Sequence, residues 1–168
     1  MAASRIYLRQ PGIRDEREFL KRCGESRALH HPWVAPPAAG EQFRAYVKRM
    51  RDAANCAMLV CVKETDEIAG VINATNIVRG VFRSAYLGYY AFAGFERRGL
   101  MREGLAAAVR HGFRELKLHR MEANIQPGNA ASIALVKACG FRLEGYSPKY
   151  LKINGRWRDH ERWAIVDD

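Results

Sequence analysis

The chain has 168 residues, 48% of them hydrophobic, and a formal net charge of +10, so it can bury the core of one globular domain spanning residues 1–168. The four cysteines form neither a CxxC pair nor a zinc-type spacing with histidine, which argues against a metal site. No apolar run resembles a membrane span or a signal peptide, which favours a cytoplasmic protein with reduced cysteines. The positive charge suits an anionic cofactor, an acidic protein face or nucleic acid, and a merely solvated basic surface fits equally well.

The first half of the chain alternates short strands with amphipathic helices. A strand is predicted over residues 6–9, and after the Pro11-Gly12 break a helix opens at Asp15 and reaches about Cys23. Three prolines exclude a regular helix over residues 30–37, a loop that also holds His30, His31 and Trp33. These side chains could line a substrate mouth, and Trp33 could equally anchor the loop to the core. A further helix is expected over about 41–53.

Three strands follow and form an antiparallel meander, with predicted ranges 57–62, 68–77 and 85–92. Helical spacing of apolar residues resumes after Gly99 and continues to Leu116. The next strand is predicted over 120–125, and since a strand, a helix and a strand form a crossover, the two strands around this helix should be parallel.

The last part of the chain carries clear boundary signals. Asn129 is a good N-cap for a helix that ends at Gly140. The final strands, 141–151 and 157–166, are joined by Asn154-Gly155, a strong hairpin signal.

The junction between the strand at 85–92 and the following helix has the features of an anion-binding site. An Arg- and Gly-rich turn connects them, and a helix N-terminus presents backbone N–H groups together with the positive end of the helix dipole. The side chains of Arg97, Arg98 and Arg102 add formal charge. The junction therefore predicts a grip for the pyrophosphate of a cofactor.

The order of these elements resembles the GNAT superfamily of acyl-CoA N-acyltransferases over nearly the whole chain. It is closest to the ribosomal-protein-alanine N-acetyltransferase group. The segments that carry this resemblance are Tyr7-Leu-Arg9, Gly99-Leu-Met101, Pro127-x-Asn129-x-x-Ser132 and the ending Glu144-Gly-Tyr146…Tyr150-Leu…Asn154-Gly-x-Trp157-x-Asp159-His160, and the ending is the most specific of them. The resemblance implies an α+β, three-layer fold: a mixed, mostly antiparallel sheet of about seven strands flanked by helices, with a central parallel βαβ crossover. It also implies acetyl-CoA as cosubstrate, no metal, and domains that often form homodimers, although the sequence identifies no interface.

The resemblance assigns the cofactor-binding residues. The family's phosphate motif falls on Glu96–Met101 with Gly99 at its central glycine, while Glu96 and Met101 depart from the general pattern. Backbone groups at the end of the preceding strand are expected to pair with the pantetheine arm and polarise the thioester carbonyl, whereas the side chains of Tyr89 and Tyr90 are expected to serve the core. The expected cofactor-binding set is Tyr90, Ala91, Phe92, Arg97, Arg98, Gly99, Leu100, Met101, Arg102, Asn129 and Ser132.

Two residues are the predicted catalytic groups. Glu122 lies mid-strand, matches the general base of related N-terminal acetyltransferases, and could alternatively be a strand residue paired with an arginine. Ser132 could hydrogen-bond the CoA sulfur or only bond back to the helix cap. The tyrosine that some relatives use as general acid is replaced by Val136. His160 is left out of the catalytic set, because a histidine on such a strand is more often structural.

The sequence predicts an N-acetyltransferase that acts by direct attack in a ternary complex. The favoured acceptor is the α-amine of a protein, such as a ribosomal protein, because an α-amine titrates near 8 and is partly neutral at physiological pH. The alternatives are a small-molecule amine (a polyamine, an amino acid or an aminoglycoside) and a non-catalytic domain that binds acetyl-CoA or RNA.

Overall fold

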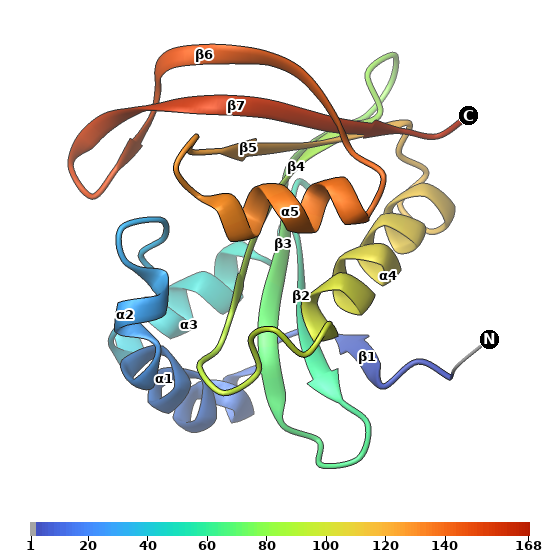
Figure 1. The fold of residues 1–168 in the computed structure, drawn as a ribbon. Coiled ribbons are helices and arrows are strands. Elements are labelled where there is room, and N and C mark those ends of the chain that lie inside the picture. Colours follow the sequence, from blue (N-terminus) through green and yellow to red (C-terminus); the bar gives the residue numbers. More distant parts are fainter. Residues whose placement is uncertain (1–2) are drawn as a thin grey trace.

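The computed structural model describes residues 3–168 and contains one sheet flanked by helices (Figure 1). The strands are β1 (Ile6–Arg9), β2 (Cys56–Val62), β3 (Ile68–Val78), β4 (Ser84–Ala91), β5 (Arg120–Ile125), β6 (Arg142–Ile153) and β7 (Arg156–Val166). The helices are η1 (Ile13–Asp15), α1 (Glu16–Glu25), α2 (Arg27–His30), α3 (Gly40–Arg49), α4 (Leu100–Arg114) and α5 (Ala130–Ala138).

The seven strands lie in the order β1-β2-β3-β4-β5-β7-β6. All neighbouring strands are antiparallel except β4 and β5, which are parallel and are connected by α4. This arrangement confirms the predicted mixed sheet with a central βαβ crossover. In Figure 1, β5, β6 and β7 run across the top of the molecule, while β2, β3 and β4 run downwards from them.

Helices cover both faces of the sheet, which explains why every residue of β2 is buried. On one face α4 packs closely: a Cβ on Gly104 would lie 2.8 Å from a methyl carbon of Val60. On the other face the Tyr46 hydroxyl of α3 donates a hydrogen bond to Asn73 Oδ1 at 2.6 Å, and the ring of Phe19 packs edge-on against Phe92. The core therefore holds β2 and β3 rigidly between two helical layers.

The parallel pair β4–β5 separates before β4 ends. Its register runs from Ser84 opposite Arg120 to Leu87 opposite Ala123, so residues 88–91 continue without a partner on that side. On the other side of β4, the N–H of Phe92 bonds the carbonyl of Ala69 at 2.9 Å. Because backbone groups of an antiparallel strand alternate in direction, those of Tyr89 and Ala91 point to the open edge.

The hairpin β6–β7 closes the sheet beyond β5. Its turn residues have left-handed backbones, with φ of 50° at Asn154 and 78° at Gly155, which is the conformation that an Asn-Gly turn favours. The Asn-Gly prediction is thus confirmed. Within residues 3–168, no helix is both long and apolar enough to cross a membrane.

Candidate active site

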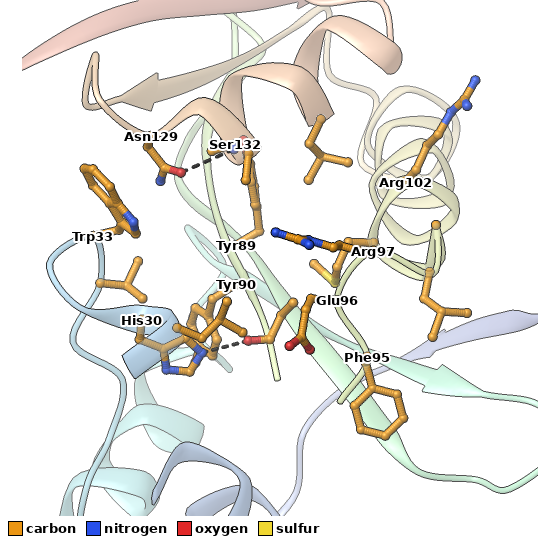
Figure 2. A pocket seen from close by; sticks show the side chains of 18 of the residues that line it. His30, Trp33, Tyr89, Tyr90, Phe95, Glu96, Arg97, Arg102, Asn129 and Ser132 are labelled. Carbon is orange, nitrogen blue, oxygen red and sulfur yellow. Dashed lines mark hydrogen bonds between the residues drawn. The ribbon is translucent and has the colours of Figure 1, made fainter. Parts of the chain in front are cut away.

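A first cavity of about 440 Å³ opens where β4 ends, between the start of α4 and the helix α5 (Figure 2). Helix α2 and the loop after it supply a third wall through Leu29, His30 and Trp33. Apolar and aromatic side chains dominate the lining, and a few polar groups from the predicted set stand among them: Arg97, Arg102, Asn129 and Ser132. An elongated ligand with an apolar arm and an anionic end fits this distribution.

The turn that leads into α4 has the backbone of an anion site. Gly99 is the N-cap of α4 and has φ of 77°, and Arg97 also adopts a left-handed conformation with φ of 60°. Left-handed residues in a turn let successive N–H groups point at an anion, and the 15-residue helix α4 adds its dipole. Arg5 fastens this turn, because its guanidinium donates to the carbonyl of Arg98 at 2.9 Å and to Glu103 Oε1 at 2.6 Å.

The three predicted arginines have different positions. Arg97 reaches into the first cavity towards Tyr89 in Figure 2, and Arg102 lines the cavity while its guanidinium points away from the centre. Arg98 is not among the lining residues: its guanidinium lies over the Phe95 ring, 5.7 Å from the centroid. Glu96 also lines the cavity, and its carboxylate accepts the N–H of Gly94 at 2.6 Å.

The open edge of β4 forms the floor of the first cavity. Tyr90 and Ala91 line it, together with Gly99, Leu100 and Met101 of the turn. Phe92 is fully buried and does not line it. The carbonyl of Ala91 accepts a hydrogen bond from His30 Nε2 at 2.7 Å. Burial lowers the pKa of His30, and this hydrogen bond opposes that effect without cancelling it, so the ring is neutral at neutral pH.

A second cavity of about 510 Å³ lies beside the first, between β4, β5 and the β6–β7 hairpin. The two cavities share five lining residues: Trp33, Val34, Tyr89, Asn129 and Ser132. They therefore meet at the point where β4 and β5 separate. A cleft with two arms and a common junction suits two reactants that exchange a group at that junction.

A pair of hydroxyl groups stands at this junction. Tyr89 Oη lies 2.7 Å from Ser132 Oγ, and burial raises the pKa of Tyr89 to about 12 while the bond to Ser132 counteracts part of that rise. The phenol therefore keeps its proton at neutral pH. The backbone N–H of Ser132 separately donates to Asn129 Oδ1 at 3.3 Å, which confirms Asn129 as the N-cap of α5.

Glu122 occupies a different environment from Ser132. Its carboxylate forms an ion pair with Arg120 at 2.7 Å, and Arg120 also bonds Glu144. Glu122 lies opposite Tyr86 across the β4–β5 pair, yet it lines neither cavity. The structure thus brings Ser132, but not Glu122, to the junction.

Sequence reasoning missed the contact that Tyr89 makes and set His160 aside. Tyr89 packs against the core as expected, and its hydroxyl in addition reaches Ser132 of α5. His160 is buried and lines the second cavity, as does Asn124. Alternate residues of a strand share a face, so Asn124 lies on the same face of β5 as Glu122, which the sequence predicted to be functional. This spacing could have identified Asn124 as a second candidate on that face.

Comparison with known proteins agrees with this geometry. The family model described as "Acetyltransferase (GNAT) domain" matches residues 5–142, and the chain belongs to this family. A probable N-acetyltransferase, YjcK of Bacillus subtilis, is 37% identical over 170 residues, covering 96% of this chain and 94% of its own. A [ribosomal protein uS5]-alanine N-acetyltransferase of Escherichia coli is 47% identical over 100 residues, covering 60% of this chain and 52% of its own.

The fold agrees with a solved structure as well. Mycobacterium smegmatis RimJ in complex with CoA-disulfide superposes with a TM-score of 0.88 at 26% identity, covering 96% of this chain and 81% of that one. Spermidine N(1)-acetyltransferase also occurs among the relatives. The expected fold, the acetyltransferase activity and the use of acetyl-CoA as cosubstrate are thereby confirmed.

Proposed function

We propose that this N-acetyltransferase acetylates the α-amine at the N-terminus of a protein, such as a ribosomal protein. The observation that carries the proposal is the chemistry of the second cavity. Among the described residues that line it there is no Asp, Glu, Lys or Arg. A polyamine or an aminoglycoside carries several positive charges, which a neutral cavity does not compensate, whereas a peptide N-terminus brings one amine.

The surroundings of the second cavity support the same acceptor. Four basic residues between positions 149 and 158 of the β6–β7 hairpin are exposed: Lys149, Lys152, Arg156 and Arg158. Their charge repels polycations and attracts an acidic stretch of a protein substrate. The similarity to the ribosomal-protein enzyme of Escherichia coli points in this direction as well.

In this proposal the first cavity holds acetyl-CoA, which supplies the activated acetyl group. The turn at Gly99 and the side chains of Arg97 and Arg102 bind the phosphates. The open edge of β4, where Ala91 lies, pairs with the pantetheine arm and directs a backbone N–H at the thioester oxygen. Ser132 and Tyr89 stand at the junction, where the thiolate leaves.

The Ser132 hydroxyl is the proposed proton donor to that thiolate. Tyr89 keeps its proton, and in this proposal the phenol is the donor in its bond with Ser132 Oγ, which leaves the serine proton free to point at the sulfur. Glu122, the general base that the sequence predicts, is paired with Arg120 and lines neither cavity, and a Glu122→Gln variant tests its role.

The experiment offers the purified protein acetyl-CoA with peptides that begin with Ala or Ser, and follows thiol release and the mass of the product. The matched control is the same peptide with a blocked N-terminus and a free lysine. Spermidine and an aminoglycoside are assayed in parallel. Turnover of the free α-amine alone supports the proposal, and preferential turnover of a polyamine or an antibiotic refutes it. Binding of acetyl-CoA without turnover of any amine would identify a non-catalytic domain.

A further inference from the structure

The second cavity contains two hydrogen-bond acceptors that the protein leaves without a donor. Asn124 Oδ1 is buried and has no hydrogen-bond partner among the described residues. His160 is also buried, and its ring contributes to the same lining. Buried acceptors are costly when unpaired, so a ligand that carries N–H donors would satisfy them.

The tautomer of His160 follows from its one recorded hydrogen bond. His160 Nδ1 lies 2.9 Å from the carbonyl oxygen of Arg158, and a carbonyl only accepts, so Nδ1 carries the proton. In the neutral ring Nε2 then holds a free lone pair. No hydrogen bond to Nε2 occurs among the described residues. The backbone thus orients the ring in the way that an orienting group fixes a catalytic histidine.

We propose that His160 is the general base that deprotonates the acceptor amine and that Asn124 Oδ1 positions this amine. The inference rests on the proposed function, because it requires an amine in the second cavity. The charged amine enters as an ammonium group and transfers one proton to His160 Nε2, directly or through one water. Its nitrogen lone pair then forms the bond to the acetyl carbon.

The remaining protons and electrons balance without another reactant. The carbon–sulfur bond breaks and its electron pair leaves with the sulfur. Ser132 gives its proton to the thiolate and takes up the second proton that leaves the nitrogen. His160 returns its proton to solvent. The products are the amide, the thiol and one released proton.

The groups around His160 are compatible with this role. The Tyr150 ring of β6 lies edge-on to the His160 ring, with 6.3 Å between the two ring centroids, and Tyr86 of β4 lines the same cavity. On β7, Asp159 is engaged by the Tyr146 hydroxyl, and the guanidinium of Arg162 lies against Gly145. The β5 side offers the uncharged Asn124 and Gln126. Among the described lining residues, His160 is therefore the one side chain with a basic nitrogen.

The test compares His160→Asn with wild type, because asparagine can keep the donor to the Arg158 carbonyl but has no basic nitrogen. His119→Gln is the control: it removes an exposed imidazole that lines neither cavity. At pH 7 we expect kcat for the peptide to fall about 100-fold in His160→Asn and to stay unchanged in the control. The deficit should shrink below about tenfold at pH 9, where an α-amine is already neutral.

Two further readouts separate a base from a structural residue. His160→Asn should bind acetyl-CoA with the affinity of wild type, since His160 does not line the first cavity. Asn124→Ala should raise KM for the peptide more than it lowers kcat. A deficit that is equal at pH 7 and pH 9, or unchanged kcat, would overturn the inference. So would a pH-dependent loss in Glu122→Gln with His160→Asn unaffected, because the base would then be Glu122. Wild type that turns over no amine would refute the proposed function itself.

Discussion

Removing the hydroxyls of Tyr89 and Ser132, singly and together, tests the junction of the two cavities. The 2.7 Å bond between them joins a half-buried phenol to a half-buried serine. Ser132→Ala removes the hydrogen-bond partner of the phenol, so it should lower the free energy of unfolding by about 1 kcal/mol. Tyr89→Phe leaves a serine that water can reach and should cost about 1 kcal/mol or less. The cap bond survives both changes, because it uses the backbone N–H of Ser132.

The same cycle predicts the kinetics. Ser132→Ala should lower kcat about 100-fold, equivalent to about 2.7 kcal/mol, because the thiolate loses its proton donor. Tyr89→Phe should lower it about tenfold, since Tyr89 acts through Ser132. The double variant should then be no slower than Ser132→Ala alone. Thiol release measured with saturating acetyl-CoA and peptide gives kcat, and urea unfolding gives stability. Additive losses in kcat would refute the relay, because they would mean that the two hydroxyls act independently.

Three other changes probe the first cavity and its supports. Gly70→Ala should destabilise the fold by about 1–3 kcal/mol in urea unfolding, since the added Cβ would lie 2.8 Å from the carbonyl oxygen of Tyr90; unchanged stability would mean that the end of β4 yields easily. Arg97→Ala should weaken acetyl-CoA binding about tenfold by calorimetry and leave acetyl-pantetheine binding unchanged, because only the former carries phosphates; equal weakening of both would place Arg97 elsewhere. Burial lowers the pKa of His30, so the unfolded chain binds more protons than the folded one as the pH falls below about 6.5. The stability of the wild type should therefore fall as the pH drops from about 6.5 towards the lowered pKa. His30→Gln should flatten this part of the plot of stability against pH, and an identical slope in both proteins would contradict the reasoning.

Local signals were sufficient for most of the fold. The strand at Arg120–Ile125 has the predicted ends, and the Asn154-Gly155 turn and the Asn129 cap lie where the sequence placed them. Each of these features depends on a few neighbouring residues, whose conformational preferences are strong. Helix α3 instead ends at Arg49, four residues before its predicted end at 53, and α2 forms immediately before the proline-containing loop.

The site was harder to predict, because it depends on contacts between distant segments. The residue types of Gly99 and Asn129 alone predict their roles in a turn and a helix cap. The residues next to Tyr89 do not indicate that its hydroxyl contacts Ser132, 43 positions later. The ion pair of Glu122 with Arg120 was one of two alternatives that the strand pattern left open. Side-chain partners across a sheet are fixed by register and by splay, and a single sequence specifies neither with certainty.

The separation of β4 from β5 divides the lining of the site between two parts of the chain. The first cavity is formed largely by the segment from Tyr89 to Arg102 and by α5, whereas the far wall of the second is the β6–β7 hairpin, including Tyr150 and His160. Residues 142–166 could thus be replaced by the hairpin of a related enzyme while the grip on acetyl-CoA is retained. Such a chimera would exchange one acceptor for another in a single graft. Because His160 lies in the exchanged segment, the graft would also replace the proposed base, so acceptor choice and deprotonation of the amine would change together.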